Sequence, residues 1–275
     1  MLELNQVYHG DCLDVMKDID GGSIDMILAD PPYGTTSCKW DSIIPLEPMW
    51  EQLKRVIKKK GAIVLTASQP FTTTLISSNM KMFKYCWVWE KEKGTGFARA
   101  NKQPLRKHED VVVFYTKQPL YNSEGTKLSV PYKHTLPINK SNSDNVAGSG
   151  YENDGKRIYT TYTHTKKHSI LRFSRDNTKN SAHPTQKPVA LMEYLIKTYT
   201  NEGDTVLDFC AGSGTTGVAC KITNRKYILI EQEEKDCEIA RQRIQNPNYK
   251  LLKTKANTKL GLFPEDKINE WCEIK

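Results

Sequence analysis

The chain reads Thr205-Val206-Leu207-Asp208-Phe209-Cys210-Ala211-Gly212-Ser213-Gly214-Thr215-Thr216-Gly217 in its last third. The apolar run 205–210 predicts a buried strand, and the stretch from Thr215 to Lys221 predicts a short helix. Glycines in the loop permit a tight turn and close backbone approach, and a helix start offers free N–H donors. These residues predict an α/β fold with a nucleotide-cofactor loop.

A second loop follows a second buried strand. Ile24–Ala29 is apolar apart from Asp25, and Asp30-Pro31-Pro32-Tyr33 comes directly after it. Asp30 is an acceptor, and the prolines have carbonyls but no N–H, so the turn is rich in acceptors. Tyr33 adds a flat face for stacking. The turn suits the exocyclic amino group of a base, although proline and glycine also end strands without any function.

Two cofactor classes fit the glycine loop. The spacing of Gly212, Gly214 and Gly217, with Glu231 after the next predicted strand at 226–230, matches a dinucleotide fingerprint and keeps a nicotinamide enzyme open. Asp208 at the strand tip would repel a pyrophosphate. Its charge favours a cationic cofactor, and S-adenosylmethionine carries a sulfonium and an ammonium but no phosphate.

Three motifs in order carry a family resemblance. Asp30–Tyr33 comes first, His183-Pro184-Thr185-Gln186-Lys187-Pro188 second, and the Asp208–Gly217 loop third. The chain resembles the β group of amino-methylating DNA methyltransferases from Gly10 to about Arg243. The resemblance implies a circularly permuted Rossmann-like fold, with a mostly parallel sheet, an antiparallel edge hairpin and an inserted target-recognition region.

The resemblance also implies residue roles. Catalysis falls to Asp30, Pro31, Pro32 and Tyr33. Cofactor binding falls to Asp11, Thr185, Lys187, Asp208, Phe209, Gly212, Gly214, Thr215 and Glu231. Asp11 could equally cap the helix that follows it, and Lys187 could lie in solvent.

The expected reaction is methyl transfer from S-adenosylmethionine to N6 of an adenine flipped out of duplex DNA. Cytosine N4 offers the same amino group, but the cytosine enzymes of the resembled family usually carry serine where Asp30 stands. Other interpretations stay open: an NAD-dependent oxidoreductase, a nucleic-acid-binding protein without turnover, and an RNA or protein substrate.

Charge indicates where DNA binds. The net charge is +8, and eleven basic against five acidic residues lie between Lys117 and Ala182, interleaved with tyrosines. We expect residues 1–116 and 182–245 to form the methyltransferase domain, 117–181 the recognition insert and 246–275 a tail. A solvated insertion is the alternative. Predicted DNA contacts are Lys39, Trp40, Lys156, Arg157, Lys166, Lys167, Arg172 and Arg175.

The cysteines, histidines and apolar runs indicate whether a metal site or a membrane segment is expected. The seven cysteines form no CxxC pair and no Cys/His metal-binding spacing occurs, so we expect no metal site. No signal-like or membrane-length segment is evident, and we expect a cytoplasmic protein. The resemblance allows a homodimer.

The remaining elements follow from periodicity. We expect strands at 6–9, 61–65, 83–90 and 110–115, the last two as an antiparallel edge pair. Helices are expected at 13–19, 47–59, 71–78 and 188–199, and a last helix after Glu231 runs to about Ile244.

Overall fold

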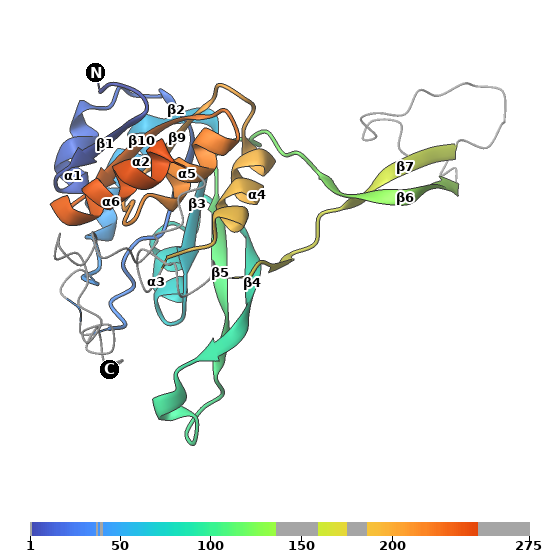
Figure 1. Ribbon diagram of the computed structural model, residues 1–275, viewed down its shortest axis with the longest axis horizontal. Helices are drawn as coiled ribbons and strands as arrows, with labels where there is room; N and C mark the ends of the chain where they lie inside the picture. The colour runs from blue at the N-terminus through green and yellow to red at the C-terminus, as the bar shows by residue number, and fades with distance from the viewer. Residues whose placement is uncertain (1, 37, 39–40, 136–158, 175–185, 247–275) are drawn as a thin grey trace. The chain divides into compact units, whose positions relative to one another are not determined.

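A computed structural model describes residues 2–36, 38, 41–135, 159–174 and 186–246 (Figure 1). Contacts divide the chain into two compact units, residues 1–122 with 169–275, and residues 123–168. The small unit contains one antiparallel strand pair, β6 (Glu124–Thr135) and β7 (Tyr159–Lys166). All other helices and strands of the described residues belong to the large unit.

An eight-stranded sheet forms the centre of the large unit, in the order β1-β10-β9-β2-β3-β5-β4-β8. The strands are β1 (Gln6–His9), β2 (Ile24–Ala29), β3 (Ile57–Ala67), β4 (Phe83–Thr95), β5 (Arg106–Phe114), β8 (Ile170–Arg172), β9 (Thr205–Asp208) and β10 (Lys226–Glu231). The first five in sheet order are parallel, and β5 is antiparallel to both β3 and β4.

Helices cover both faces of the sheet, as Figure 1 shows. α1 (Cys12–Val15), α2 (Leu46–Val56) and α3 (Phe71–Ser78) pack on one face, and α4 (Val189–Tyr199), α5 (Thr215–Ile222) and α6 (Glu234–Gln245) on the other. Side chains alternate between the layers: Met26 and Leu28 of β2 belong to the core under α4 to α6, and Ile27 to the core under α1 to α3. A strand buried on both faces explains the unbroken apolar runs in the sequence.

The position of the site follows from the sheet order. β2 and β9 are neighbours, with Met26 opposite Val206 and Ile27 opposite Leu207. From this pair the chain continues to β3 in one direction and to β10 in the other, through helices on opposite faces. Such a reversal leaves a crevice at the carboxyl ends of the two strands. The Asp30 turn and the glycine loop leave the sheet at this edge.

One expected helix ends early. The sequence predicts a helix over 47–59, but α2 ends at Val56 and Ile57 to Lys60 belong to β3. Ile57 has an extended backbone and pairs with Ile24 of β2. A Cβ on Gly61 would lie 2.6 Å from the Ile57 side chain and 2.8 Å from the Asp25 carbonyl, so the strand approaches closely only at a glycine.

The antiparallel pair of β4 and β5 is present, but it is not the edge of the sheet. β8 pairs in parallel with β4 through Val88 opposite Ile170 and Trp89 opposite Leu171. Three residues are too few to be predicted as a strand from periodicity. The small unit is shorter than the predicted insert 117–181. Residues 117–122 and 169–174 of that segment belong to the large unit.

Within the described residues, no helix is long and apolar enough to cross a membrane. The same residues contain no cluster of three or more His, Cys, Asp or Glu side chains arranged for a metal ion.

Candidate active site

A cavity of about 580 Å³ lies at the carboxyl ends of β2 and β9. The acceptor turn, Asp30 to Tyr33, forms part of its lining, and the glycine loop from Asp208 to Ser213 forms another part. Asp11 and Glu231, from the ends of β1 and β10, also line it. The volume is that of an ordinary small-molecule site. The two motifs, far apart in the sequence, share one cavity.

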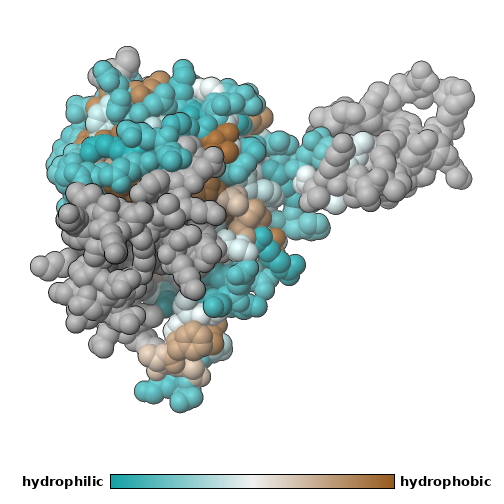
Figure 2. Space-filling model, viewed as in Figure 1, coloured by the Kyte–Doolittle hydropathy of each residue, from teal (hydrophilic) through white to brown (hydrophobic). Residues whose placement is uncertain are grey.

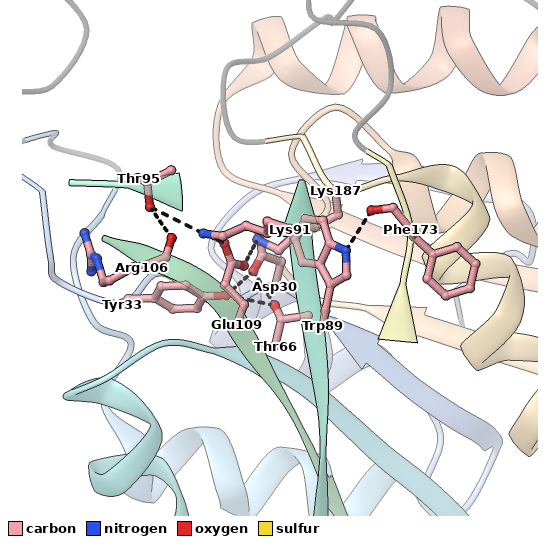
Figure 3. A network of polar contacts seen from close by, with 10 residues as sticks. All are labelled: Asp30, Tyr33, Thr66, Trp89, Lys91, Thr95, Arg106, Glu109, Phe173 and Lys187. Carbon is pink, nitrogen blue, oxygen red and sulfur yellow. Dashed lines mark hydrogen bonds and ion pairs between the residues drawn. The ribbon is translucent and has the colours of Figure 1, made fainter. Parts of the chain in front are cut away.

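The Asp30 carboxylate is held by three side chains (Figure 3). Its Oδ1 accepts hydrogen bonds from the Tyr33 hydroxyl (2.7 Å) and from the Thr66 hydroxyl, and its Oδ2 accepts one from Lys187 Nζ at 2.6 Å. Two carboxylate oxygens offer about four acceptor positions. Asp30 Oδ2 therefore keeps one position for a further donor in the cavity.

Lys187 is shared between two carboxylates. Its Nζ lies 3.2 Å from Glu109 Oε2, and Lys91 Nζ lies 3.0 Å from Glu109 Oε1. Lys187 and Lys91 are only 8% and 4% exposed. Two cations and two anions thus alternate in one row, Asp30–Lys187–Glu109–Lys91, and Figure 3 shows these side chains next to one another.

This alternation fixes the protonation states. Burial acts to raise the pKa of Glu109, but the charges of Lys187 and Lys91 outweigh it and lower the pKa to about 2. Burial acts to lower the pKa of Lys187, and Asp30 and Glu109 outweigh it, so the pKa lies above its ordinary value. Burial, together with the charges of Asp30 and Glu109, raises the pKa of Tyr33 well above its usual range. Lys187 and Tyr33 are therefore donors at neutral pH, and neither is a base.

The Tyr33 ring is fixed as well as its hydroxyl. It stacks on Phe71 of α3 with ring centroids 5.5 Å apart and an interplanar angle of 22°. Lys187 Nζ lies 5.6 Å from the same ring centroid. The ring lines the cavity in one defined orientation.

Asp41 organises the loop after the turn. Its Oδ1 accepts from the backbone N–H groups of Tyr33 (2.7 Å) and Gly34 (2.9 Å), and its Oδ2 from those of Thr35 (2.8 Å) and Thr36 (2.7 Å). Asp41 is 6% exposed. One buried carboxylate therefore satisfies four consecutive amides, which are charge-assisted hydrogen bonds.

Acidic side chains surround the other end of the cavity. Asp11, Asp208, Glu231, Glu233 and Asp236 line it there. Asp11 also accepts the Leu13 N–H (2.8 Å) as N-cap of α1, so the capping alternative holds while the side chain lines the cavity. Such a wall attracts a cation and repels a pyrophosphate.

Glu231 and Asp208 are tuned by burial. Glu231 accepts the Gly212 N–H (2.7 Å) and the Glu233 N–H (3.0 Å), and burial raises its pKa. Asp208 is 4% exposed and accepts the Cys210 N–H at 3.0 Å. Burial raises the pKa of Asp208 to about 7. Its ionisation therefore falls in the physiological range.

The two glycines of the loop have different structural roles. Gly212 has φ +49, and a Cβ there would meet nothing within 4 Å, because the residue faces the cavity. Gly214 has φ +76, and a Cβ there would lie 2.6 Å from Ala240 Cβ and 2.9 Å from its Cα. Gly212 leaves room for a ligand, and Gly214 lets α5 begin against α6.

The predicted residues divide into three groups. Asp11, Lys187, Phe209, Gly212, Thr215 and Glu231 line the cavity with Asp208 and the Asp30–Tyr33 turn, although Lys187 reaches the Asp30 carboxylate directly. Gly214 is not part of the lining and lies against Ala240 instead. Lys166 and Lys167 lie in the small unit, where burial lowers the pKa of Lys167 to about 8, and Arg172 of β8 pairs with Glu90 at 2.8 Å. Thr185, Lys39, Trp40, Lys156, Arg157 and Arg175 lie outside the described residues.

The residues of the site that were not predicted include Thr66, Lys91, Glu109 and Asp41, and Glu233 and Asp236 at the acidic end. Lys91 had a visible signal, because it continues the alternating buried row of Trp87 and Trp89 in β4. A charged residue on the buried face of a strand usually has a partner of opposite charge. The sequence does not say which partner it is.

Comparisons with known proteins identify the family of the chain. Residues 24–242 match the model of a family of DNA methylases, N6_N4_Mtase. The type II methyltransferase M1.MboII of Moraxella bovis is 24% identical over 272 residues, which is 94% of this chain and 100% of that protein.

Two solved structures share the fold. One is the M1.HpyAVI–SAM complex, with a TM-score of 0.57, 24% identity and coverage of 86% of this chain and 98% of that one. The other is the cytosine-N4-specific PvuII DNA methyltransferase, with a TM-score of 0.64, 16% identity and coverage of 96% of this chain and 92% of that one. The family model covers well over half of the sequence, and the chain belongs to the DNA methylase family.

Proposed function

We propose that this DNA methyltransferase transfers a methyl group from S-adenosylmethionine to the N6 amino group of an adenine turned out of duplex DNA. The observation that carries the proposal is the single cavity, which joins an acceptor-rich turn at one end to an acidic, glycine-lined pocket at the other.

The acidic end fits the cofactor. S-adenosylmethionine supplies an electrophilic methyl group on a positively charged sulfur when it is bound. Asp208 and its neighbours provide the negative charge that a sulfonium and an ammonium need. Glu231, which also lines the cavity, is proposed to accept hydrogen bonds from the ribose hydroxyls. The open space at Gly212 lets backbone approach the ligand. Asp11, Phe209 and Thr215 complete the proposed pocket, with Gly214 shaping the loop.

The acceptor turn acts on the amino group of the base. The free acceptor position on Asp30 Oδ2 and the Pro31 carbonyl hold the two amino hydrogens, while Pro32 keeps the turn rigid. This arrangement favours a pyramidal nitrogen with its lone pair directed toward the acidic end. Asp30 then accepts the proton that the nitrogen releases. Positioning, rather than a covalent enzyme intermediate, accounts for the rate.

Lys187 and Glu109 position Asp30. The Lys187 ammonium at Oδ2 leaves the carboxylate one orientation, and Glu109 with Lys91 holds the ammonium in place. Lys187 is therefore proposed as a positioning residue for the acceptor, in addition to the cofactor contact that the resemblance implies.

Base flipping costs a few kcal/mol of lost pairing and stacking. The Tyr33 ring, fixed by Phe71 and by its hydroxyl, is proposed as the surface on which the flipped base stacks, which returns about 1–3 kcal/mol.

The choice of adenine rests on Asp30. Cytosine N4 has the same amino geometry, and the resembled cytosine enzymes usually carry serine at this position. The test is mass analysis of nucleosides from duplex DNA incubated with the protein and labelled S-adenosylmethionine. We expect labelled N6-methyladenine, and N4-methylcytosine as the only product would reverse the choice.

The order of the motifs along the chain supports the circularly permuted β-group arrangement, with 1–116 and 182–245 as one methyltransferase domain. Residues 117–181 are proposed as the inserted recognition region, with Lys166 and Lys167 among its DNA contacts, and residues 246–275 as a tail. A homodimer is proposed on the resemblance alone, and sedimentation at several concentrations tests it.

A further inference from the structure

The β4–β5 hairpin continues past the active-site cavity. Trp89, Lys91 and Thr95 of β4 and Arg106 and Glu109 of β5 line the cavity. The connection between the strands contains a 3-10 turn at Phe97–Arg99. Figure 1 shows the hairpin extending from the sheet as an arm with this turn at its end. We call residues 91–107 the arm. Its base forms part of the cavity, and its tip lies beyond the cavity.

The arm is basic. It contains six Lys or Arg residues and one acidic residue, Glu92. The Lys91 ammonium is already paired with the Glu109 carboxylate inside the site, and Lys107 Nζ lies 3.4 Å from Glu90 Oε1. Lys93 and Lys102 are exposed. A basic projection beside an active site complements a polyanion.

An aromatic ring stands at the tip. Phe97 is 70% exposed, the most exposed large hydrophobic side chain in the described part of the chain. Figure 2 shows a hydrophobic patch near the end of this projection with hydrophilic residues around it. A lone aromatic among cations is poorly suited to a second copy of a chain whose net charge is +8, because the basic surroundings would repel each other.

Arg106 adds a donor without an acceptor. Its Nε is buried and has no hydrogen-bond partner among the described residues, although the side chain lines the cavity. Buried donors in native proteins are almost always paired, so this one indicates an acceptor that arrives with a ligand. A phosphate oxygen next to the target nucleotide is such an acceptor.

We propose that the arm binds duplex DNA beside the target base. Lys93, Lys102 and Arg106 contact backbone phosphates, and Phe97 packs into the base stack where the target base leaves it. Apolar side chains fill and wedge open base steps in this way in other DNA-binding proteins. The inference rests on the proposed function and adds a DNA-binding surface outside residues 117–181.

The first experiment measures the charge contacts. The variant Lys93→Ala/Lys102→Ala is compared with Lys59→Ala/Lys60→Ala, which removes two exposed lysines at the amino end of β3, at the opposite end of the strand from the cavity. Fluorescence anisotropy with a mixed-sequence duplex gives Kd across a salt series. Loss of two phosphate contacts reduces the slope of log K against log salt by about 1.8. A slope equal to that of wild type, or an equal loss in the Lys59/Lys60 control, overturns the proposal.

The second experiment tests Phe97. Phe97→Ala is compared with Met80→Ala, another exposed apolar residue at 59%. On duplexes that contain a mapped methylation site, we expect Phe97→Ala to lower kcat/KM roughly tenfold or more. An abasic position opposite the target should restore the rate, because the base is then already unpaired. An undiminished rate, or a loss that the abasic duplex does not restore, contradicts the insertion.

Two controls separate the possible failures. Calorimetric binding of S-adenosylmethionine confirms that each variant is folded at the active site. If wild-type protein binds DNA but methylates none, the proposed function fails. The salt slopes of the lysine variants still decide whether the arm binds DNA.

Discussion

Lys187 Nζ and Asp30 Oδ2 lie 2.6 Å apart, although 157 residues separate them in the chain. The contact joins the segment before α4 to the end of β2, and Glu109 of β5 shares the same ammonium at 3.2 Å. The acceptor carboxylate is thus positioned from two other elements of the large unit. Its charge is balanced by Lys187, which is only 8% exposed.

The buried charges predict non-additive substitutions. Glu109→Gln leaves Lys91 and Lys187 with one anion between them, and breaking such a buried pair costs about 3–5 kcal/mol of folding free energy. Lys91→Met with Glu109→Gln leaves Asp30 and Lys187 balanced. We therefore expect the double variant to be more stable than Glu109→Gln alone, as measured by urea denaturation of all four members of the cycle. Additive losses would mean that the ion pair does not exist.

The Asp41 carboxylate accepts hydrogen bonds from four backbone N–H groups, and a variant with fewer acceptor positions tests their role. Asp41→Asn keeps the size of the side chain but replaces one oxygen by an NH2 group, which cannot accept from two of the four amides. We expect kcat to fall at least about tenfold as the loop loses its fixed position, with S-adenosylmethionine affinity changed by less than about threefold. Single-turnover rates and calorimetry test this. If affinity for S-adenosylmethionine fell by the same factor as kcat, Asp41 would not act by holding the loop after the Asp30–Tyr33 turn alone.

Asp208 predicts a pH-dependent stability. Its pKa is about 7 in the folded protein against an ordinary 3.8, so between these values the folded state binds more protons and wild-type stability falls as pH rises. Asp208→Asn lacks this loss. The variant should gain roughly 3 kcal/mol relative to wild type between pH 5 and pH 8. Thermal unfolding across pH measures it, with the exposed Asp14→Asn as control. A gain independent of pH would contradict the assignment.

The same ionisation should affect cofactor binding. A cationic ligand prefers the charged form of Asp208, so affinity for S-adenosylmethionine should strengthen as pH rises through about 7. Asp208→Asn should bind more weakly and lose this dependence, which calorimetric titration on either side of that pH measures.

The two loop glycines separate stability from binding. Gly214→Ala introduces a positive φ penalty and a clash with the Ala240 backbone, whereas Gly212→Ala introduces only the φ penalty, about 1–2 kcal/mol. We expect Gly214→Ala to be the less stable protein in urea denaturation. Gly212→Ala should lose more cofactor affinity than its stability loss explains, because its methyl group enters the cavity. If Gly214→Ala lost more cofactor affinity than Gly212→Ala, a ligand-facing role for Gly212 would be excluded.

The sequence predicts the parts of this site that are local. Asp30 and Asp208 end buried strands, and such ends meet at one edge of a parallel sheet, so their shared location follows from periodicity and one topological rule. The side chains that bind the Asp30 carboxylate could not be predicted in this way. Thr66, Glu109 and Lys187 come from three distant segments, and only the register of β3 and β5 and the path into α4 bring them together. A parallel strand as short as Ile170–Arg172 has no readable period either, because its pairing with β4 is decided by tertiary contacts.

The proposed mechanism depends above all on Asp30, whose carboxylate holds the amino group that receives the methyl. The decisive measurement is the single-turnover rate of label transfer from S-adenosylmethionine to duplex DNA by Asp30→Ala, with cofactor and DNA affinities measured on the same protein. We predict a rate reduced by at least about a thousandfold, with both affinities within about threefold of wild type. A variant that keeps the wild-type rate would show that the carboxylate is not the acceptor, and the proposed mechanism would be wrong.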